Sequence, residues 1–311
     1  MTAQFGCAVI DRAYIKEIEM AETAVRDVFS IRRSLDSPVG VPRDFVTKAV
    51  EDSTLAETAA SPMMEAWLRR DTMPIPSARD REGYYGDRHF EYWLSGLSDY
   101  LKIKKTCSTT DWAKASLLDF GGATGRVARH FYAQENMADV MICDVNINNV
   151  DWVIENLPSG FSAFKNSALP SLPLPDDSVD VVTAFSVFTH MSEYELAWLY
   201  ELRRILKPNG VLYATIHNDD TWNILPSTWV YNVLIQSEDF RSAYSPNTDL
   251  RERRVFEYST EAAYNCNTFH PNSYIHRVWG KTFKVLDILP VCHSYQSAVV
   301  LRKEPRRVVS G

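Results

Sequence analysis

The sequence predicts an α/β protein with a mostly parallel, seven-stranded sheet that is preceded by a helical N-terminal region. From residue 115 onward, short apolar runs alternate with turns and amphipathic segments, which is the pattern of a parallel sheet with crossover helices. Near the end of the chain, two apolar runs follow each other closely enough to pair antiparallel. We therefore expect the last strand to run against the others.

The expected elements of this second part follow in a regular order. Strands are expected at 117–120, 140–143, 161–165, 180–185, 211–216, 284–290 and 297–302. Helices are expected at 126–133, 150–157 and 193–206. Leucines at Leu196, Leu199 and Leu202 place one apolar face on the third helix, and Pro208-Asn209-Gly210 is expected to end it.

The chain is expected to divide at about residue 105. Residues 1–105 contain several prolines and helical spacing at 13–32 and 90–101, so they are expected to form a helical region that acts as a substrate lid or in oligomerisation. Residues 106–311 are expected to form the α/β domain. Its segment at about 218–280 is rich in aromatic residues and is expected to be an insertion that caps a substrate.

Composition excludes several classes of protein. Of the 311 residues, 45% are apolar and 23% are charged, and the net charge is −7. An acidic chain lacks the basic surface that binds nucleic acid, so no nucleic-acid partner is expected. No apolar run is long enough to span a membrane or to form a signal peptide, and the five cysteines are widely spaced without a CxxC pair. We therefore expect a cytoplasmic protein without disulfides or structural zinc.

The sharpest motif is Asp119-Phe120-Gly121-Gly122-Ala123-Thr124-Gly125-Arg126, which lies between an expected strand and an expected helix. Glycines in such a loop let a ligand approach backbone N–H groups at the positive end of a helix. A dinucleotide-binding loop would need glycine at positions 123 and 126, and a P-loop would need Lys-Ser/Thr after Gly125. The spacing therefore excludes both.

The loop resembles motif I of the class I S-adenosylmethionine (SAM)-dependent methyltransferases, Asp/Glu-x-Gly-x-Gly-x-Gly, with Ala123 in place of the central glycine. Residues 172–180 and 201–210 resemble the runs that precede the fourth and fifth strands of that family. The resemblance implies a Rossmann-like fold, SAM as cofactor and S-adenosylhomocysteine as product. Residues 146–158, 185–193 and 269–280 look like bacterial methyltransferase domains associated with glycan or nodulation-factor-type biosynthesis.

The same resemblance implies a set of cofactor-binding residues: Asp119, Gly121, Gly122, Gly125, Arg126, Asp144, Asn166, Phe185 and Ser186. Asp144, at the end of the second strand, is expected to accept hydrogen bonds from the ribose hydroxyls. Asn166 is expected to face the adenine amino group, and Phe185 and Ser186 to line the pocket. Arg126 is expected in the first turn of a helix, where the helix dipole disfavours a cation. This position indicates an acidic partner, such as the SAM carboxylate or the substrate, unless Arg126 is a surface residue.

Two histidines are candidate bases. His217 ends the fifth strand and His190 follows the fourth, and ligands of open α/β sheets bind at the carboxyl ends of strands. His217 is the preferred base; the alternative interpretation of His190 is a residue that packs beneath the cofactor. Candidate substrate residues are Tyr84, Tyr85, His89, Trp222 and His270. Asp219 and Asp220 lack a third oxygen ligand at recognisable spacing, so no metal is expected.

These residues predict methyl transfer to a hydroxyl group of a sugar or a natural-product intermediate. Two alternatives stay open: N-methyl transfer to an amino sugar or amine, and a non-catalytic SAM-fold binding or scaffold protein. A small-molecule or sugar partner is expected in the first two cases, and a homodimer is compatible with the sequence.

Overall fold

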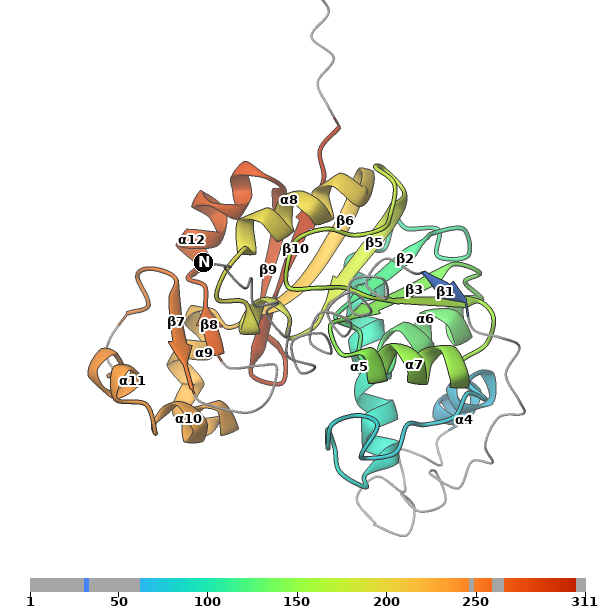
Figure 1. The fold of residues 1–311 in the computed structure, drawn as a ribbon, viewed down its shortest axis with the longest axis horizontal. Helices are drawn as coiled ribbons and strands as arrows, with labels where there is room; N and C mark the ends of the chain where they lie inside the picture. Colours follow the sequence, from blue (N-terminus) through green and yellow to red (C-terminus); the bar gives the residue numbers. More distant parts are fainter. Residues whose placement is uncertain (1–30, 34–61, 246–248, 259–265, 306–311) are drawn as a thin grey trace, which may run out of the picture.

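A single mixed sheet organises the computed structural model, which describes residues 31–33, 62–245, 249–258 and 266–305 (Figure 1). Within these residues the sheet has eight strands in the order β1-β4-β3-β2-β5-β6-β10-β9. Their bounds are β1 Arg32–Arg33, β2 Leu117–Phe120, β3 Val140–Asp144, β4 Phe161–Lys165, β5 Val179–Ala184, β6 Leu206–Ile216, β9 Lys284–His293 and β10 Gln296–Arg302. Strands β4, β3, β2, β5 and β6 are parallel, whereas β10 pairs antiparallel with both β6 and β9.

The predicted seven-stranded sheet with an antiparallel last strand is therefore confirmed, and β1 adds a short edge strand to it. Residues Arg32 and Arg33 pair antiparallel with β4. The expected helix 13–32 was wrong at Arg32, which is extended and forms an ion pair with Asp151. Residues 13–30 of that expected helix lie outside the described part of the chain.

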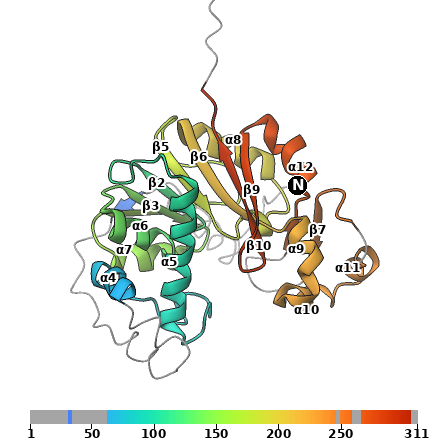
Figure 2. The same cartoon turned by 180° about the vertical axis from the view of Figure 1, so that it is seen from behind.

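Helices cover both faces of the sheet, as Figure 2 shows from behind. One face carries α5 (His89–Thr106), α6 (Ala128–Glu135) and α7 (Ile147–Asn156), and α4 (Pro62–Arg70) packs beside α6. The opposite face carries α8 (Glu195–Ile205) and α12 (Asn272–Arg277). Apolar side chains of each helix layer are buried against the sheet, so the core has two halves separated by the strands.

The turn between α8 and β6 differs from the expectation that strand 211–216 follows a separate loop. Strand β6 begins at Leu206, directly after the helix. The pairing of β6 with β5 jumps from Val179–Leu206 to Val181–Val211, so residues 207–210 form a bulge. Asn209 has a φ of 69° there, a conformation that asparagine tolerates better than most residues.

The described part of the N-terminal region shares a core with the sheet. Leu68 and Trp93 belong to the same buried cluster as Leu117. The carboxylate of Asp71 accepts hydrogen bonds from Arg129 Nε at 2.7 Å and from Trp93 Nε1 at 2.8 Å, and both side chains of the ion pair are at most 1% exposed. This pair fastens the segment before α5 to α6.

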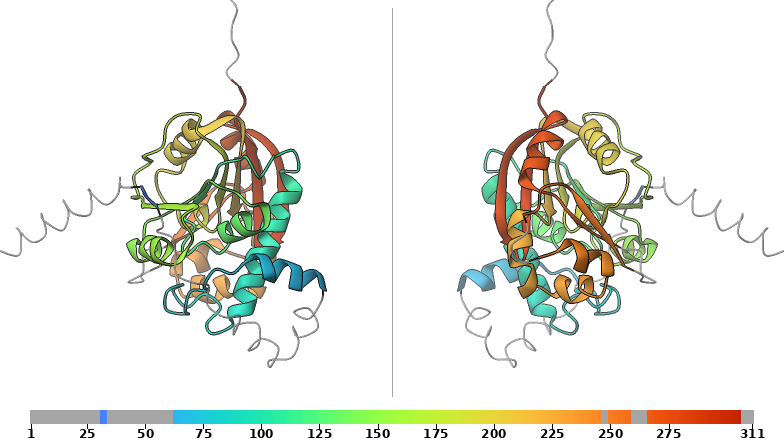
Figure 3. Two further views of the ribbon diagram at one scale, coloured as in Figure 1. Left: turned by 90° about the vertical axis from the view of Figure 1, so that its right-hand side faces the viewer. Right: turned by 90° about the vertical axis from the view of Figure 1, so that its left-hand side faces the viewer.

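The insertion expected at about 218–280 forms short helices and a hairpin, seen in the right-hand view of Figure 3. It contains α9 (Asp219–Ile224), α10 (Trp229–Leu234), α11 (Glu238–Ala243), β7 (Arg254–Glu257) and β8 (Cys266–Phe269). A 3₁₀ turn at 225–227 joins α9 to α10 and another, at 279–281, follows α12; a third, at 188–190, follows β5 outside the insertion. Its core is a separate cluster: Trp222, Leu225, Val230, Leu234, Phe240, Leu250, Phe256 and Phe269. A bridge between His217 and Phe269 joins β8 to the end of β6.

None of the described helices is long and apolar enough to cross a membrane.

Candidate active site

The glycine loop between β2 and α6 turns sharply over the end of β3. Gly121 and Gly125 have φ values of 69° and 80°, which lie in the left-handed region that favours glycine. The N–H groups of Gly121 and Gly122 both donate to the carbonyl of Cys143, at 2.8 and 3.2 Å. A Cβ atom on Gly121 would lie 2.5 Å from Cγ2 of Val187. The loop thus packs too closely for side chains at this position.

Ala123, which replaces the central glycine of the family motif, also adopts a left-handed conformation, with a φ of 47°. An alanine in this region is strained by roughly 1–2 kcal/mol relative to a right-handed conformation. Its N–H compensates by donating to Oδ2 of Asp144 at 3.0 Å. The replacement therefore preserves the turn of the loop.

Asp144 ends β3 as expected and is only 3% exposed. Besides the Ala123 bond to Oδ2, its Oδ1 accepts from Asn146 N at 2.8 Å and from Asn149 Nδ2 at 3.2 Å. Burial raises the pKa of Asp144, and these donors oppose the rise. The carboxylate is thus held rigidly beside the loop.

Asp119 lies beneath the loop. Its Oδ1 accepts from Thr183 Oγ1 at 2.7 Å, and its carboxyl carbon lies 2.8 Å from the position of a Cβ on Gly122. Burial raises the pKa of Asp119 to about 6. Asp119 therefore supports the loop by contacts with β5 and with Gly122.

Asn166 follows β4 and is 4% exposed. Its Nδ2 donates to the carbonyl of Ser167 at 3.2 Å, but its Oδ1 is buried without a hydrogen-bond partner among the described residues. A buried, unpaired acceptor is destabilising by about 1–3 kcal/mol unless a ligand or water donates to it.

Arg126 has the acidic partner that its position indicated, and that partner is Asp99 of α5. Arg126 NH1 donates to Asp99 Oδ2 at 2.7 Å and to Ser95 Oγ at 3.2 Å. Its guanidinium lies 5.7 Å from the ring centre of Tyr84 and 5.5 Å from that of Phe185. The expected placement in the first helical turn was wrong, because α6 begins at Ala128.

Phe185 and Ser186 follow β5, at the carboxyl edge of the sheet. Ser186 has a φ of 55°, and its N–H donates to Thr215 Oγ1 at 2.8 Å. Its hydroxyl group lies 2.9 Å from Nε2 of Gln296, at the start of β10. The Phe185 ring packs edge-on against His293 at 5.0 Å, so β5 is tied to the hairpin between β9 and β10.

His217 follows β6 and is 1% exposed, with neither ring nitrogen in a hydrogen bond to another described residue. Burial lowers the pKa of His217 well below 6.5, and the nearby His190 and His270 lower it further. The imidazole is therefore neutral at physiological pH. A neutral, unpaired imidazole is able to accept a proton.

His190 and His270 lie close to His217, but each is anchored. His190 lies in the 3₁₀ turn Phe188–His190, and its Nδ1 is 2.8 Å from the carbonyl of Cys266. A carbonyl only accepts, so Nδ1 carries the proton and Nε2 the lone pair of the neutral ring. His270 is fully buried, with Nε2 3.0 Å from Oε2 of Glu195.

Glu195, at the start of α8, is buried and contacts four side chains. Besides His270, it accepts from Trp279 Nε1 at 2.6 Å, from Tyr274 OH at 3.1 Å and from Arg253. Burial raises its pKa, but the bonds and charges of its partners outweigh this and lower the pKa to about 2. Glu195 therefore stays ionised and fixes the orientation of His270.

The turn that precedes α5 lies against the glycine loop. Arg126, at the end of the loop, lies 5.7 Å from the ring centre of Tyr84 in this turn, and Tyr92 OH on α5 is 3.1 Å from Thr124 Oγ1. Glu82 Oε1, also in the turn, accepts from Asn146 Nδ2 at 2.7 Å after β3. The exposed Tyr84 stacks edge-on against Tyr85, 4.7 Å between ring centres. Two of the candidate substrate residues thus lie near Arg126: Tyr84 faces its guanidinium, and Tyr85 packs against Tyr84.

Comparisons with known proteins agree with this geometry. Residues 118–214 match the model of a methyltransferase domain family. Residues 118–214 form a methyltransferase domain of this family.

Two curated proteins and one crystal structure are similar to the chain. A demethylmenaquinone methyltransferase of Chlamydia pneumoniae is 32% identical over 97 residues, which cover 31% of this chain and 42% of that protein, so the match spans less than half of the relative. An uncharacterised methyltransferase of Schizosaccharomyces pombe is 22% identical over 203 residues, 58% of this chain and 72% of the relative. The crystal structure of a SAM-dependent methyltransferase from Mesorhizobium loti shares the fold, with a TM-score of 0.51, 12% identity and coverage of 66% and 97% of the two chains.

Class I methyltransferases use SAM and release S-adenosylhomocysteine, and the residues of this domain fit that cofactor. The carboxylate of Asp144, at the end of β3, would accept a hydrogen bond from a ribose hydroxyl. The unpaired Oδ1 of Asn166, after the adjacent strand β4, would accept a hydrogen bond from an adenine amino group. A Cβ on Gly121 or Gly122 would lie 2.5 Å from Cγ2 of Val187 or 2.8 Å from the carboxyl carbon of Asp119, so glycine lets the loop pack closely against the strands.

Two other candidate substrate residues have structural contacts. His89 Nδ1 lies 3.0 Å from NH2 of the buried Arg81, which also donates to Pro76 O at 3.1 Å. Trp222 is 4% exposed and packs against Phe256 and Phe269 in the core of the insertion. Their roles toward a substrate stay predictions.

Asp219 and Asp220 are occupied by polar contacts at the start of α9. Asp219 Oδ2 accepts from Asn272 N at 2.6 Å, and Asp220 Oδ2 accepts from Asn218 Nδ2 at 2.8 Å. Within the described residues, no group of three or more His, Cys, Asp or Glu side chains is arranged to hold a metal ion.

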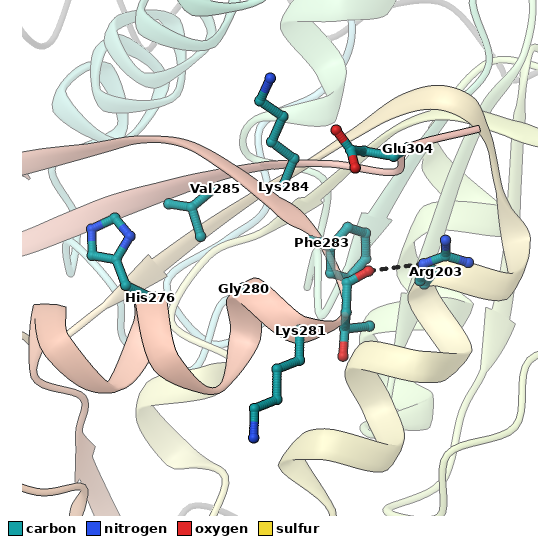
Figure 4. Close-up of a pocket in the computed structure, with 9 residues that line it drawn as sticks. Arg203, His276, Gly280, Lys281, Phe283, Lys284, Val285 and Glu304 are labelled. Atoms are coloured by element: carbon teal, nitrogen blue, oxygen red, sulfur yellow. Dashed lines mark hydrogen bonds between the residues drawn. The ribbon is translucent and has the colours of Figure 1, made fainter. Parts of the chain in front are cut away.

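A hollow of about 460 Å³ lies at the start of β9, away from the carboxyl edge of the sheet. It is lined by Arg203, His276, Gly280, Lys281, Thr282, Phe283, Lys284, Val285 and Glu304. Figure 4 shows Lys281 and Lys284 pointing away from each other, and Arg203 Nε donates to Thr282 O at 2.8 Å. The basic side chains do not converge on one ligand, so this hollow has no part in the candidate site.

Sequence reasoning missed three residues around Arg126. His293 Nδ1 lies 2.6 Å from Asp99 Oδ1, and His293 Nε2 lies 2.6 Å from the hydroxyl group of Tyr213. Asp99, His293 and Tyr213 come from α5, β9 and β6, and no motif joins positions so far apart in the chain. The antiparallel return of β10 and β9 to β6 brings His293 to Tyr213, and the packing of α5 brings Asp99 to His293.

Proposed function

We propose that the chain transfers the methyl group of SAM to a hydroxyl group of a polar small molecule, such as a sugar or a natural-product intermediate. His217 acts as the base, and His190 is the alternate base. The observation that carries this proposal is the buried His217, whose two ring nitrogens have no partner at the carboxyl end of β6. In a site that needed no proton acceptor, such a group would only destabilise the fold.

The bound cofactor supplies an activated methyl group on a positively charged sulfur. The chain's own task is to hold the acceptor hydroxyl in line with that methyl group and to take its proton. The neutral ring of His217 accepts the proton as the acceptor oxygen forms its new bond to carbon. Glu195 fixes the orientation of His270, which lies near His217.

The insertion supports a polar acceptor with apolar faces. Most of its aromatic side chains form its own core. Outside the insertion, in the turn between β9 and β10, the half-buried Tyr295 lies beside His217, with ring centres 5.7 Å apart. The exposed Trp229 donates from Nε1 to Tyr295 OH at 2.8 Å. Aromatic faces next to a polar group suit a sugar, whose ring has apolar and hydroxyl surfaces.

The first test is calorimetry with S-adenosylhomocysteine. Binding with micromolar affinity is expected, and no binding would overturn the proposal in favour of a scaffold role. The second test measures transfer of a labelled methyl group from SAM to a panel of sugars and their matched amino sugars. Transfer to hydroxyl acceptors that is lost in His217→Ala supports the proposal. Transfer restricted to the amino sugars would replace it with N-methylation.

A further inference from the structure

Glu82 lies beside the end of β3, although it belongs to the turn before α5. Its Oε1 accepts from Asn146 Nδ2 at 2.7 Å and from Asn149 Nδ2 at 3.4 Å. The same Asn149 Nδ2 donates to Asp144 Oδ1 at 3.2 Å. One asparagine amide thus connects two carboxylates, one from the N-terminal region and one from the methyltransferase domain.

The hydrogen bonds of Asp144 leave it too few free positions for a ribose. A carboxylate has about four lone-pair sites, two on each oxygen. The chain fills both sites of Oδ1, through Asn146 N and Asn149 Nδ2, and one site of Oδ2, through Ala123 N. One site is left, whereas a ribose presents two hydroxyl donors.

Glu82 supplies the missing acceptor. Its Oε1 is occupied by the asparagine amides, but its Oε2 accepts no hydrogen bond within the described residues, and the side chain is exposed at the surface of the site. A second, independent feature points to a ligand here: the side-chain Oδ1 of Asn166 is buried and unpaired. Asn166 adjoins Asp144, because its backbone N–H donates to the carbonyl of Asp144 at 3.1 Å. The adenine and ribose positions therefore adjoin each other.

We infer that Glu82 binds the cofactor: it accepts one ribose hydroxyl of SAM, and Asp144 accepts the other. The inference rests on the proposed use of SAM and extends the cofactor site to Glu82 in the turn before α5, outside the 118–214 stretch that matches the family model. Two adjacent carboxylates repel each other when the site is empty. The two hydroxyl hydrogens of a ribose relieve this repulsion, so the pair favours the ligand-bound state.

Calorimetry with S-adenosylhomocysteine tests the inference without any acceptor. Glu82→Ala is expected to weaken binding about tenfold, because it removes a charge-assisted hydrogen bond, and Glu82→Gln to weaken it less. Glu91→Ala is the matched control, since Glu91 pairs with Arg88 at 2.6 Å on the outer side of α5. That variant is expected to bind like the wild type. Melting temperatures of all three variants are expected to stay near the wild-type value.

The 2′-deoxy and 3′-deoxy analogues of S-adenosylhomocysteine identify the contact. Both are expected to bind the wild type more weakly than the parent compound. In Glu82→Ala, one of the two is expected to bind as tightly as the parent, because the hydroxyl that it lacks no longer has a partner. If Glu82→Ala weakens the binding of the parent compound and both analogues by the same factor, or leaves their binding unchanged, Glu82 does not bind a ribose hydroxyl. Either result would leave the proposed function intact. A wild type that binds none of the three compounds would overturn both the role of Glu82 and the proposed function.

Discussion

Arg126, at the end of the glycine loop, donates a 2.7 Å hydrogen bond to Asp99 in the middle of α5. Burial alone would raise the pKa of Asp99, but Arg126 and His293 outweigh it and hold the pKa well below its usual value. The ionised Asp99 in turn neutralises a cation near the start of α6, where the helix dipole disfavours it. The N-terminal region therefore completes the electrostatics of the cofactor loop as well as the core.

Asp144→Ala is expected to weaken the binding of S-adenosylhomocysteine at least tenfold. The change removes a ribose acceptor worth about 1.5–3 kcal/mol for each charge-assisted bond, and it frees the N–H of Ala123. Calorimetry measures the effect. Asp139→Ala, an exposed position just before the same strand, is the control and is expected to bind normally. Normal binding by both variants would mean that Asp144 is not a ribose ligand.

Much of the sheet was predictable from the sequence because its strands are short apolar runs between turn residues, as at Leu117–Phe120 and Phe161–Lys165. The cofactor loop was predictable because its glycines are spaced along one segment. The partner of Arg126 was not, since Asp99 lies 27 residues away on α5, and His293, the second partner of Asp99, lies 194 residues from it. Interactions of this kind depend on the packing of whole elements, which local spacing does not encode.

Gly121→Ala is expected to destabilise the fold more than Gly86→Ala does. Both glycines have a positive φ, so alanine is strained by about 1–2 kcal/mol at either position. Only at Gly121 does the new Cβ also meet a neighbour, Cγ2 of Val187, at 2.5 Å, whereas nothing lies within 4 Å of it at Gly86. Urea unfolding of the two variants isolates the clash. The double variant Gly121→Ala, Val187→Ala is expected to regain part of the loss; no recovery would contradict this account.

Asp71→Ala is expected to lower the free energy of unfolding by about 3–5 kcal/mol, because it leaves the buried guanidinium of Arg129 without its partner. Burial raises the pKa of Asp71, but Arg129 outweighs this, so the folded-state pKa is lowered. The stabilisation is therefore present above the unfolded pKa of about 3.9 and is lost as the pH falls through the folded pKa. Urea titrations at pH 7 and below pH 4 measure both effects. Asp111→Ala, which breaks an exposed pair with Lys114, is expected to change stability by less than about 1 kcal/mol.

Methyl transfer is expected to need no divalent metal. Asp219 and Asp220 each accept a hydrogen bond from the chain itself, at 2.6 and 2.8 Å. Dialysis against EDTA is expected to leave turnover unchanged. A loss of turnover that magnesium restores, and that Asp219→Asn and Asp220→Asn reproduce, would make the two aspartates metal ligands instead.

His217→Ala is expected to reduce turnover by about 10²–10⁴-fold with the affinity for S-adenosylhomocysteine nearly unchanged, because a general base acts on the acceptor and not on the cofactor. The exposed His276, on α12, gives the matched control, and His276→Ala is expected to keep full activity.

The pH dependence identifies the base. Burial, then His190 and His270, lower the pKa of His217 well below 6.5, so its ring is neutral and able to accept a proton at every pH above that value. Wild-type kcat/KM for a hydroxyl acceptor is therefore expected to be level from about pH 6.5 upward and to fall only at lower pH, where the ring takes up a proton. His217→Ala is expected to lose that acidic limb. If it keeps both the activity and the limb while His190→Ala loses them, the base is His190; if both variants stay active, the acceptor is an amine, which carries its own lone pair.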